Sequence, residues 1–310
     1  MLVGDAQDNV LQGAKGNDTL DGGGGNDTLI GGSGNDIYIV RGPGATVVEL
    51  PGEGTDKIQS FISFDLGLNG AHVENLDLLG ASPINGTGNE LANVITGNVA
   101  DNILDGGFDA AGKIVDQLKG GGGNDTYIVR DIYDKVSESS NQGTDTVQSF
   151  VGYTLGSNVE NLELQGADPL KGTGNSLANV ITGNSGANVL NGKAGDDILS
   201  GGDGADVFVF DTNLSTTKTL NVDHITDFEV GVDKIWLDNA IFTKLANGAL
   251  PSTAFTADLD AASAQTRIMY DETNGFLFYD KDGTGSSSAI HFATLDTHPA
   301  GLTADDFFVV

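Results

Sequence analysis

Aspartate or asparagine recurs at every ninth residue near the start of the chain, each time just before a short apolar stretch. Residues 4 to 39 divide into four nonapeptides, GDAQDNVLQ, GAKGNDTLD, GGGGNDTLI and GGSGNDIYI, with the frame G-G-x-G-N-D-x-L-x. Carboxylate, amide and turn carbonyl oxygens are hard ligands. Calcium takes 6–8 such oxygens in flexible geometry, whereas magnesium requires a strict octahedron and keeps its waters. The chemistry indicated is calcium binding.

The elements that would position these oxygens follow from the same spacing. Six residues rich in Gly, Asn and Asp suit a tight turn with positive φ angles, and the next three, such as Thr28-Leu29-Ile30, suit a short strand with one apolar side chain inward. Two such units make one coil. Stacked coils place each turn beside the second turn along the chain, so that sixth-position side chains meet across a gap lined with carbonyls.

Two further clusters have the same period. The second covers 88–96, 97–105, an interrupted turn at 106–119, and 120–128; the third covers 174–182, 183–191, 192–200 and 201–209. Twelve turns therefore fall into three groups of four.

The in-frame repetition resembles the RTX (repeat-in-toxin) family, whose calcium-binding nonapeptides fold as a parallel β-roll. The resemblance implies metal ligands at the sixth position of each turn. These residues, in the pairs that stacked coils would bring together, are Asn9 with Asp27, Asp18 with Asp36, Asn93 with Asp116, Asn102 with Asp125, Asn179 with Asp197, and Asn188 with Asp206.

Five of these six pairs contain one Asn. A neutral amide supplies one oxygen without charge, so we expect those sites to be weaker than Asp18 with Asp36. The alternative is that the Asn-led turns bind nothing and only continue the coil.

A longer repeat overlies the nonapeptides. The segment VENLDLLGASPINGTGNELANVITGN at 73–98 recurs as VENLELQGADPLKGTGNSLANVITGN at 159–184, and GNDIYIV at 34–40 recurs as GNDTYIV at 123–129. Glycine-bounded runs of β-formers predict strands between the clusters. We therefore predict an all-β fold, a parallel β-roll or β-solenoid of duplicated blocks with a C-terminal β cap. The predicted segments are an RTX block at 1–87, a second at 88–173, a third at 174–210, and a C-terminal segment at 211–310.

The last hundred residues have another character. The segment DHITDFEVGVDKIWLD at 223–238 predicts two strands that pair across Gly231, and it resembles the segment that caps the β-roll in serralysin-like RTX proteins. The chain ends in DDFFVV, similar to the uncleaved C-terminal signal of type I secretion. A terminal edge strand of the cap is the other interpretation of these residues, and both can hold together.

Composition restricts the function. With Asp+Glu 44 against Lys+Arg 14, the formal net charge is −30, which repels nucleic acids and anionic membrane surfaces. There is no cysteine, so neither disulfides nor thiolate metal sites are available. We expect bound calcium to stabilise the fold in their place. No apolar run of transmembrane length and no secretory signal peptide are found, so we expect an extracellular protein exported by the type I secretion apparatus.

No catalytic motif stands out. His72, His224, His291 and His298 show no H-E-x-x-H spacing, and no G-x-S-x-G occurs. The run from Asp280 to Gly285 has the start of an EF-hand loop but His291 at its twelfth position, which favours a hairpin turn.

We expect a secreted, non-enzymatic calcium-binding protein that folds on meeting extracellular calcium. Alternatives are a noncatalytic calcium-binding and export module of a larger enzyme (protease, lipase or alginate epimerase), and an adhesive, matrix or small effector protein.

Overall fold

The computed structural model describes residues 1–108, 113–214, 221–259, 262–285 and 287–310. The chain divides into two compact units, Met1–Phe150 and Val151–Val310. This boundary falls inside the segment 88–173 of the sequence analysis, and the four-segment division stays a prediction. The interrupted turn at 106–119 contains residues 109–112, which lie outside the described residues.

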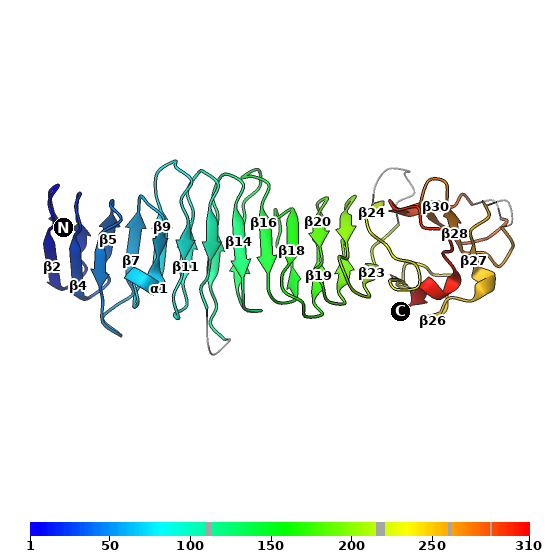
Figure 1. The fold of residues 1–310 in the computed structure, drawn as a ribbon, viewed down its shortest axis with the longest axis horizontal. Coiled ribbons are helices and arrows are strands. Elements are labelled where there is room, and N and C mark those ends of the chain that lie inside the picture. Colours follow the sequence, from blue (N-terminus) through cyan, green and yellow to red (C-terminus); the bar gives the residue numbers. More distant parts are fainter. Residues whose placement is uncertain (109–112, 215–220, 260–261, 286) are drawn as a thin grey trace. The chain divides into compact units, whose positions relative to one another are not determined.

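Unit 1 is a solenoid with two strand-bearing faces (Figure 1). All strand pairs described within it are parallel, and each strand pairs with the second one along the chain, except that β6 ends one sheet and β8 begins another. One face is β1 (Leu2–Val3), β3 (Thr19–Asp21), β5 (Ile37–Val40), β7 (Lys57–Ser60), β9 (Asn75–Leu78), β11 (Val94–Thr96), β13 (Gln117–Lys119) and β15 (Lys135–Val136). The other is β2 (Val10–Lys15), β4 (Thr28–Ser33) and β6 (Thr46–Val48), then β8 (Phe64–Asp65), β10 (Gly86–Thr87), β12 (Ile103–Asp105), β14 (Thr126–Val129) and β16 (Thr146–Ser149).

The core of unit 1 is a stack of inward side chains, one or two from most strands. Along the first face the residues in register include Leu20, Tyr38, Ile58, Leu76 and Ile95, all fully buried. Leu29, in the middle of the nonapeptide strand Thr28-Leu29-Ile30, is also fully buried, as expected. A short helix, α1 (Leu66–Asn69), follows β8, and the Asp65 side chain caps it by accepting the Leu68 N–H at 3.1 Å.

Unit 2 begins with the same coil and ends in a mixed sheet (Figure 1). One sheet has the order β17 (Tyr153–Thr154), β19 (Lys171–Thr173), β21 (Val189–Asn191), β23 (Val207–Phe210), β25 (Lys234–Leu237), β31 (Phe307–Val309) and β26 (Gly248–Ala249). The other has the order β18 (Asn161–Leu164), β20 (Val180–Thr182), β22 (Ile198–Ser200), β24 (Asp223–Ile225), β30 (Ile290–Leu295), β29 (Phe276–Tyr279), β28 (Ile268–Asp271) and β27 (Phe255–Thr256). Two 3₁₀ turns, η1 (Ser252–Ala254) and η3 (Ala304–Asp306), precede β27 and β31.

The predicted all-β parallel solenoid with a C-terminal sheet region is confirmed, but one pairing was wrong. The two strands of 223–238 do not pair across Gly231. Instead β24 pairs with β22 and β30, and β25 pairs with β23 and β31. The coil continues past the last nonapeptide, so consecutive strands still go to opposite faces.

The end of the chain also differs from an edge strand. β31 lies between β25, to which it is parallel, and β26, to which it is antiparallel. Phe307 and Val309 are buried, and Phe308 is exposed. The hairpin predicted around Asp280–Gly285 is confirmed, because β29 and β30 pair antiparallel.

Candidate metal centre

The sixth-position residues form ladders along the turns. In each of the six predicted pairs, the Asp of the later turn accepts a hydrogen bond from the backbone N–H of its partner. Oδ1 of Asp27, Asp36, Asp116, Asp125, Asp197 and Asp206 accepts from the N–H of Asn9, Asp18, Asn93, Asn102, Asn179 and Asn188, respectively, at 2.7–3.0 Å. Asn9 and Asp18 are half-buried and the other ten residues are buried. The predicted spatial pairs are therefore present; their role as calcium ligands stays a prediction.

The first glycine of a turn lies beneath these side chains. A Cβ on Gly13 would lie 2.8 Å from Asp18 Oδ2 and 2.8 Å from the Gly31 carbonyl oxygen of the next stacked turn. A methyl group at this position would therefore collide with two oxygens. The glycine that opens each nonapeptide is needed for this close approach of side-chain and backbone oxygens.

In the Asn-led turns, the side-chain amide of the sixth-position Asn makes hydrogen bonds within the protein. Asn188 Oδ1 accepts the N–H of Asn184 at 2.8 Å, and Asn188 Nδ2 donates to Asn184 Oδ1 at 3.0 Å. Asn179 Nδ2 donates instead to the carbonyls of Val159 and Glu160 at 3.1 Å. These turns have the internal signature G-N-x-x-x-N, at 88–93, 97–102, 174–179 and 183–188. Since an amide carries both donors and acceptors, such a turn is hydrogen-bonded without an ion.

The later Asp-led turns do not close in this way. Oδ2 of Asp36, Asp125, Asp197 and Asp206 is buried and has no hydrogen-bond partner within the described residues. A carboxylate has no donor of its own, and an unpartnered buried charge is strongly unfavourable. Burial raises the pKa of Asp125, Asp197 and Asp206 to about 6. These positions therefore need either a cation or a proton.

The ladder extends beyond the nonapeptides to residues that sequence analysis missed. The sixth-position residues of the last turns donate their backbone N–H groups to further carboxylates. These donors are, in chain order, Asp36, Asp116, Asp125, Asp197 and Asp206. These acceptors are Asp56, Asp134, Asp145, Asp223 and Asp233. Burial, followed by the nearby Asp197 charge, raises the pKa of Asp223 to about 8.

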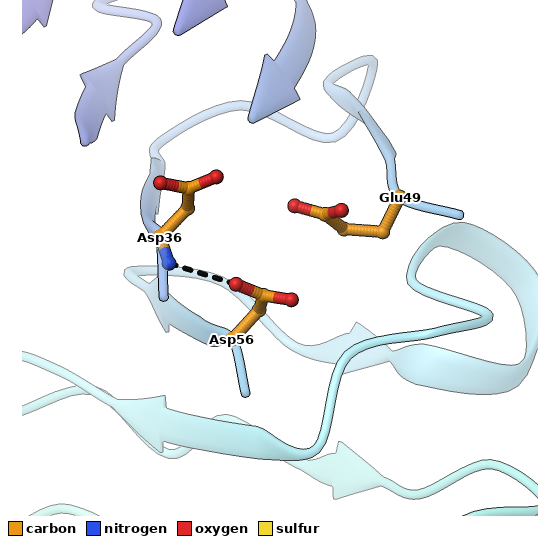
Figure 2. A group of neighbouring side chains, drawn as sticks. All are labelled: Asp36, Glu49 and Asp56. Atoms are coloured by element: carbon orange, nitrogen blue, oxygen red, sulfur yellow. Dashed lines mark hydrogen bonds between the residues drawn. The ribbon is translucent and has the colours of Figure 1, made fainter. Parts of the chain in front are cut away.

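Two glutamates were missed as well. Glu49 lies beside Asp36 and Asp56 (Figure 2), and Glu138 lies beside Asp125 and Asp145. In each group, one carboxylate oxygen from each of the three residues lies within 4.8 Å of the other two. The available signal was the shared pattern E-x-x-x-x-G-T-D at 49–56 and 138–145, which follows the last nonapeptide of clusters one and two. It has no place in the nonapeptide frame and was therefore overlooked.

The donor set fits calcium. The unpartnered atoms on the RTX turns and the two groups of clustered side chains are carboxylates, with the Tyr38 and Tyr127 hydroxyls beside them. Calcium accepts such hard ligands with irregular geometry. The unpartnered oxygens of Asp36, Asp125, Asp197 and Asp206 are the atoms that would contact an ion.

The chain was compared with family models, curated proteins and solved structures, and the family model agrees with the repeat assignment. A sequence model of the RTX calcium-binding nonapeptide repeat matches residues 3–38, 115–128 and 173–208. A search of curated proteins found no match. Similar solved structures include the solution structure of the AlgE6R3 subunit from the Azotobacter vinelandii mannuronan C5-epimerase, at 24% identity, 51% coverage of this chain, 82% coverage of that chain and a TM-score of 0.34.

In the described part of the chain, no helix has both the length and the apolar character needed to cross a membrane. The matched segments overlap all three predicted clusters, and their strands belong to successive coils whose sheets are parallel. The chain thus carries hemolysin-type RTX calcium-binding nonapeptide repeats, folded as a parallel β-solenoid.

Proposed function

We propose that the protein is a secreted calcium-binding β-roll that folds when it meets extracellular calcium, and that its role is binding and not catalysis. The observation that carries the proposal is the set of buried, unpartnered carboxylate oxygens on RTX turns, at Asp36, Asp125, Asp197 and Asp206.

The charge balance supports a calcium requirement. The chain has a net charge of −30, and the ladders bring carboxylates close together between stacked turns. In the absence of a cation these groups repel one another and lose their hydration on folding. Bound calcium would lower both penalties, and binding free energy would then be folding free energy.

The sixth-position aspartates would hold their own carboxylate oxygens in place for the ion. Asp Oδ1 holds the N–H of the preceding coil, which fixes the carboxylate and leaves Oδ2 for the ion. Asp197 and Asp206 do this in unit 2, and Asp36 and Asp125 do so in unit 1. The Asn-led turns supply hydrogen bonds alone, so we propose fewer ions than twelve turns arranged in six pairs would suggest.

A calcium titration of the full-length chain followed by circular dichroism tests this function. We expect a coil-to-β transition with a midpoint of about 10⁻⁴–10⁻³ M, as in extracellular calcium modules. Magnesium at the same concentrations is the control and should leave the chain unfolded. An unchanged β spectrum and melting temperature in chelator would contradict the proposal.

Export by a type I system is proposed from the C-terminal DDFFVV and from the RTX repeats, which are typical of secreted bacterial proteins. Because Phe307 and Val309 are buried in β31, deleting 307–310 removes a strand as well as the proposed signal. Ile235→Ala provides a matched control, since it damages the neighbouring strand in register with Phe307 and leaves the C-terminus intact.

In a strain with an RTX exporter, we expect the deletion to lose extracellular protein while Ile235→Ala is still exported. Equal export of the deletion and the full chain would refute the signal.

A further inference from the structure

We propose that Asp36, Glu49 and Asp56 form a cation site of a second kind, that Asp125, Glu138 and Asp145 form its duplicate, and that each holds one calcium ion at the end of a nonapeptide cluster. We call these two sets the Asp–Glu–Asp sites. The inference rests on the proposed calcium-binding function but concerns ligands outside the nonapeptide frame.

Glu49 occupies the place of a nonapeptide glycine. β4 and β6 pair with Ile30 opposite Val48, so the next residues in register are Gly31 and Glu49. In the same way β13 and β15 pair with Leu118 opposite Val136, which places Glu138 two residues on, beside Gly120. An ordinary turn offers only the glycine carbonyl at this point. The terminal turn offers a carboxylate, which raises the negative charge of the site.

The free oxygens of the first site face one another (Figure 2). Asp36 Oδ1 accepts the Asp18 N–H at 2.7 Å, and Asp56 Oδ1 accepts the Asp36 N–H at 2.7 Å. One Glu49 oxygen contacts the Tyr38 hydroxyl. Asp36 Oδ2 and Glu49 Oε2 have no hydrogen-bond partner in the described parts of the chain, although the two residues are only 1% and 8% exposed. Two unpartnered, buried carboxylate oxygens beside a third carboxylate are the groups that a bound cation would stabilise.

The surroundings are duplicated together with the carboxylates. In the second site Tyr127 contacts Glu138 through its hydroxyl, which also accepts the Gly120 N–H at 2.8 Å. Asp125 Oδ2 is buried without a partner.

The third cluster differs at both positions. Phe208 takes the place of Tyr38 and Tyr127, and Asp227, in register with Gly201, takes the place of the glutamate. The Asp227 carboxylate accepts hydrogen bonds from the N–H groups of Gly201 and Gly202, both at 2.9 Å. Tyrosine and glutamate are therefore replaced together, as expected if they serve one site.

The decisive measurement is the number of calcium ions bound per full-length chain, by equilibrium dialysis with metal analysis at saturating calcium. We expect Glu49→Gln and Glu138→Gln to bind one ion fewer each, and the double variant two fewer. Glu90→Gln is the matched control, because it removes the same charge from an exposed turn residue, and it should bind the wild-type number.

Tyrosine variants provide a second readout that keeps the charge. Terbium luminescence excited through tyrosine should fall in steps in Tyr38→Phe and Tyr127→Phe, and calcium affinity at each altered site should fall about tenfold, as for other groups that orient a metal ligand. This readout also covers the case in which a glutamine variant fails to fold.

An unchanged ion number in both glutamine variants would overturn the inference, because it would show that neither glutamate is needed to hold an ion. That result leaves calcium binding by the nonapeptides intact. A chain that binds no calcium at all would instead overturn the proposed function.

Discussion

Asn188 and Asp206 occupy the same place in stacked coils, yet their side chains complete the turns with different partners. Asn188 accepts from and donates to Asn184 within its own turn. Asp206 accepts the Asn188 N–H at 2.7 Å through Oδ1, while Oδ2 is buried without a partner. The amide supplies both donor and acceptor, and the carboxylate supplies acceptors alone. Only the Asp-led turns should therefore couple their stability to calcium, and four predictions test this difference.

The largest effect is expected for Asp197→Ala. Asp197 is fully buried and accepts the Asn179 N–H at 2.7 Å, so its loss leaves a buried donor unpaired, at about 1–3 kcal/mol. In calcium, losing one bound ion costs about another 3 kcal/mol at a hundredfold excess over Kd. Urea unfolding in chelator measures the contribution of the hydrogen bond to the free energy of unfolding. The additional loss seen in calcium measures the contribution of the ion. Asp203→Ala is the control, because Asp203 is exposed. If Asp197→Ala lost the same free energy of unfolding in chelator and in calcium, the proposed role of Asp197 as a calcium ligand would be contradicted.

Asn179→Asp should convert one type of turn into the other. The change removes the Nδ2 donors to the Val159 and Glu160 carbonyls and adds a buried charge. We expect about 2–4 kcal/mol of destabilisation in chelator, with part of it recovered as calcium is added. A calcium-independent loss of the same size would mean that the turn geometry, not the side chain, decides whether an ion binds.

Asn188→Ala should cost less, and equally in both conditions. It removes the bonds to Asn184, which are worth about 1–2 kcal/mol together, but no charge. The free energy of unfolding measured at several calcium concentrations should show a constant offset from the wild type. An offset that grows with calcium would place an ion at the Asn-led turn.

The smallest effect per group is expected from a change of pH. Burial, followed by Asp56 and Asp36, raises the pKa of Glu49 to about 8, and burial raises the pKa of Asp197 to about 6. The folded, calcium-free chain therefore binds more protons than the unfolded chain between about pH 4 and 8, since unfolded carboxyl pKa values lie near 4.

Lowering the pH from 8 to 5 in chelator should then stabilise the fold, by on the order of 1 kcal/mol per shifted carboxyl group. Protons compete with calcium, so the stability gained from calcium should shrink over the same range. Asn188→Ala should keep its offset throughout, because an amide does not titrate. Stability that rises with pH in chelator would contradict the assignment.

The nonapeptide period was enough to predict the coil, the strand positions and the six sixth-position pairs. Glycine, asparagine and aspartate determine turn geometry locally, and one inward leucine per strand determines which side faces the core, as Leu29 does. A repeat of fixed length also sets which turns are stacked, so Asp18 and Asp36 could be paired from their separation alone.

The rest depended on contacts between residues that no short motif joins. Asp56 accepts the Asp36 N–H because its coil is two residues longer than a pair of nonapeptides. Glu49 lies at the same site because it follows β6 in register with Gly31. The strands β24 and β25 were paired wrongly, since a local hairpin signal around Gly231 competed with the continuing coil, which offers each strand a parallel neighbour.

Residue types and period thus decided which atoms are available to bind calcium, because both act within a few residues of sequence. Only the stacked coils decided which of those atoms are satisfied. Asn93 and Asp116 look interchangeable in the repeat frame, but in the fold the Asn93 amide donates to carbonyls of the coil before it, and the Asp116 carboxylate accepts from Asn93. Whether an oxygen lacks a partner depends on every neighbour around it, and those neighbours include turns 18 or more residues away.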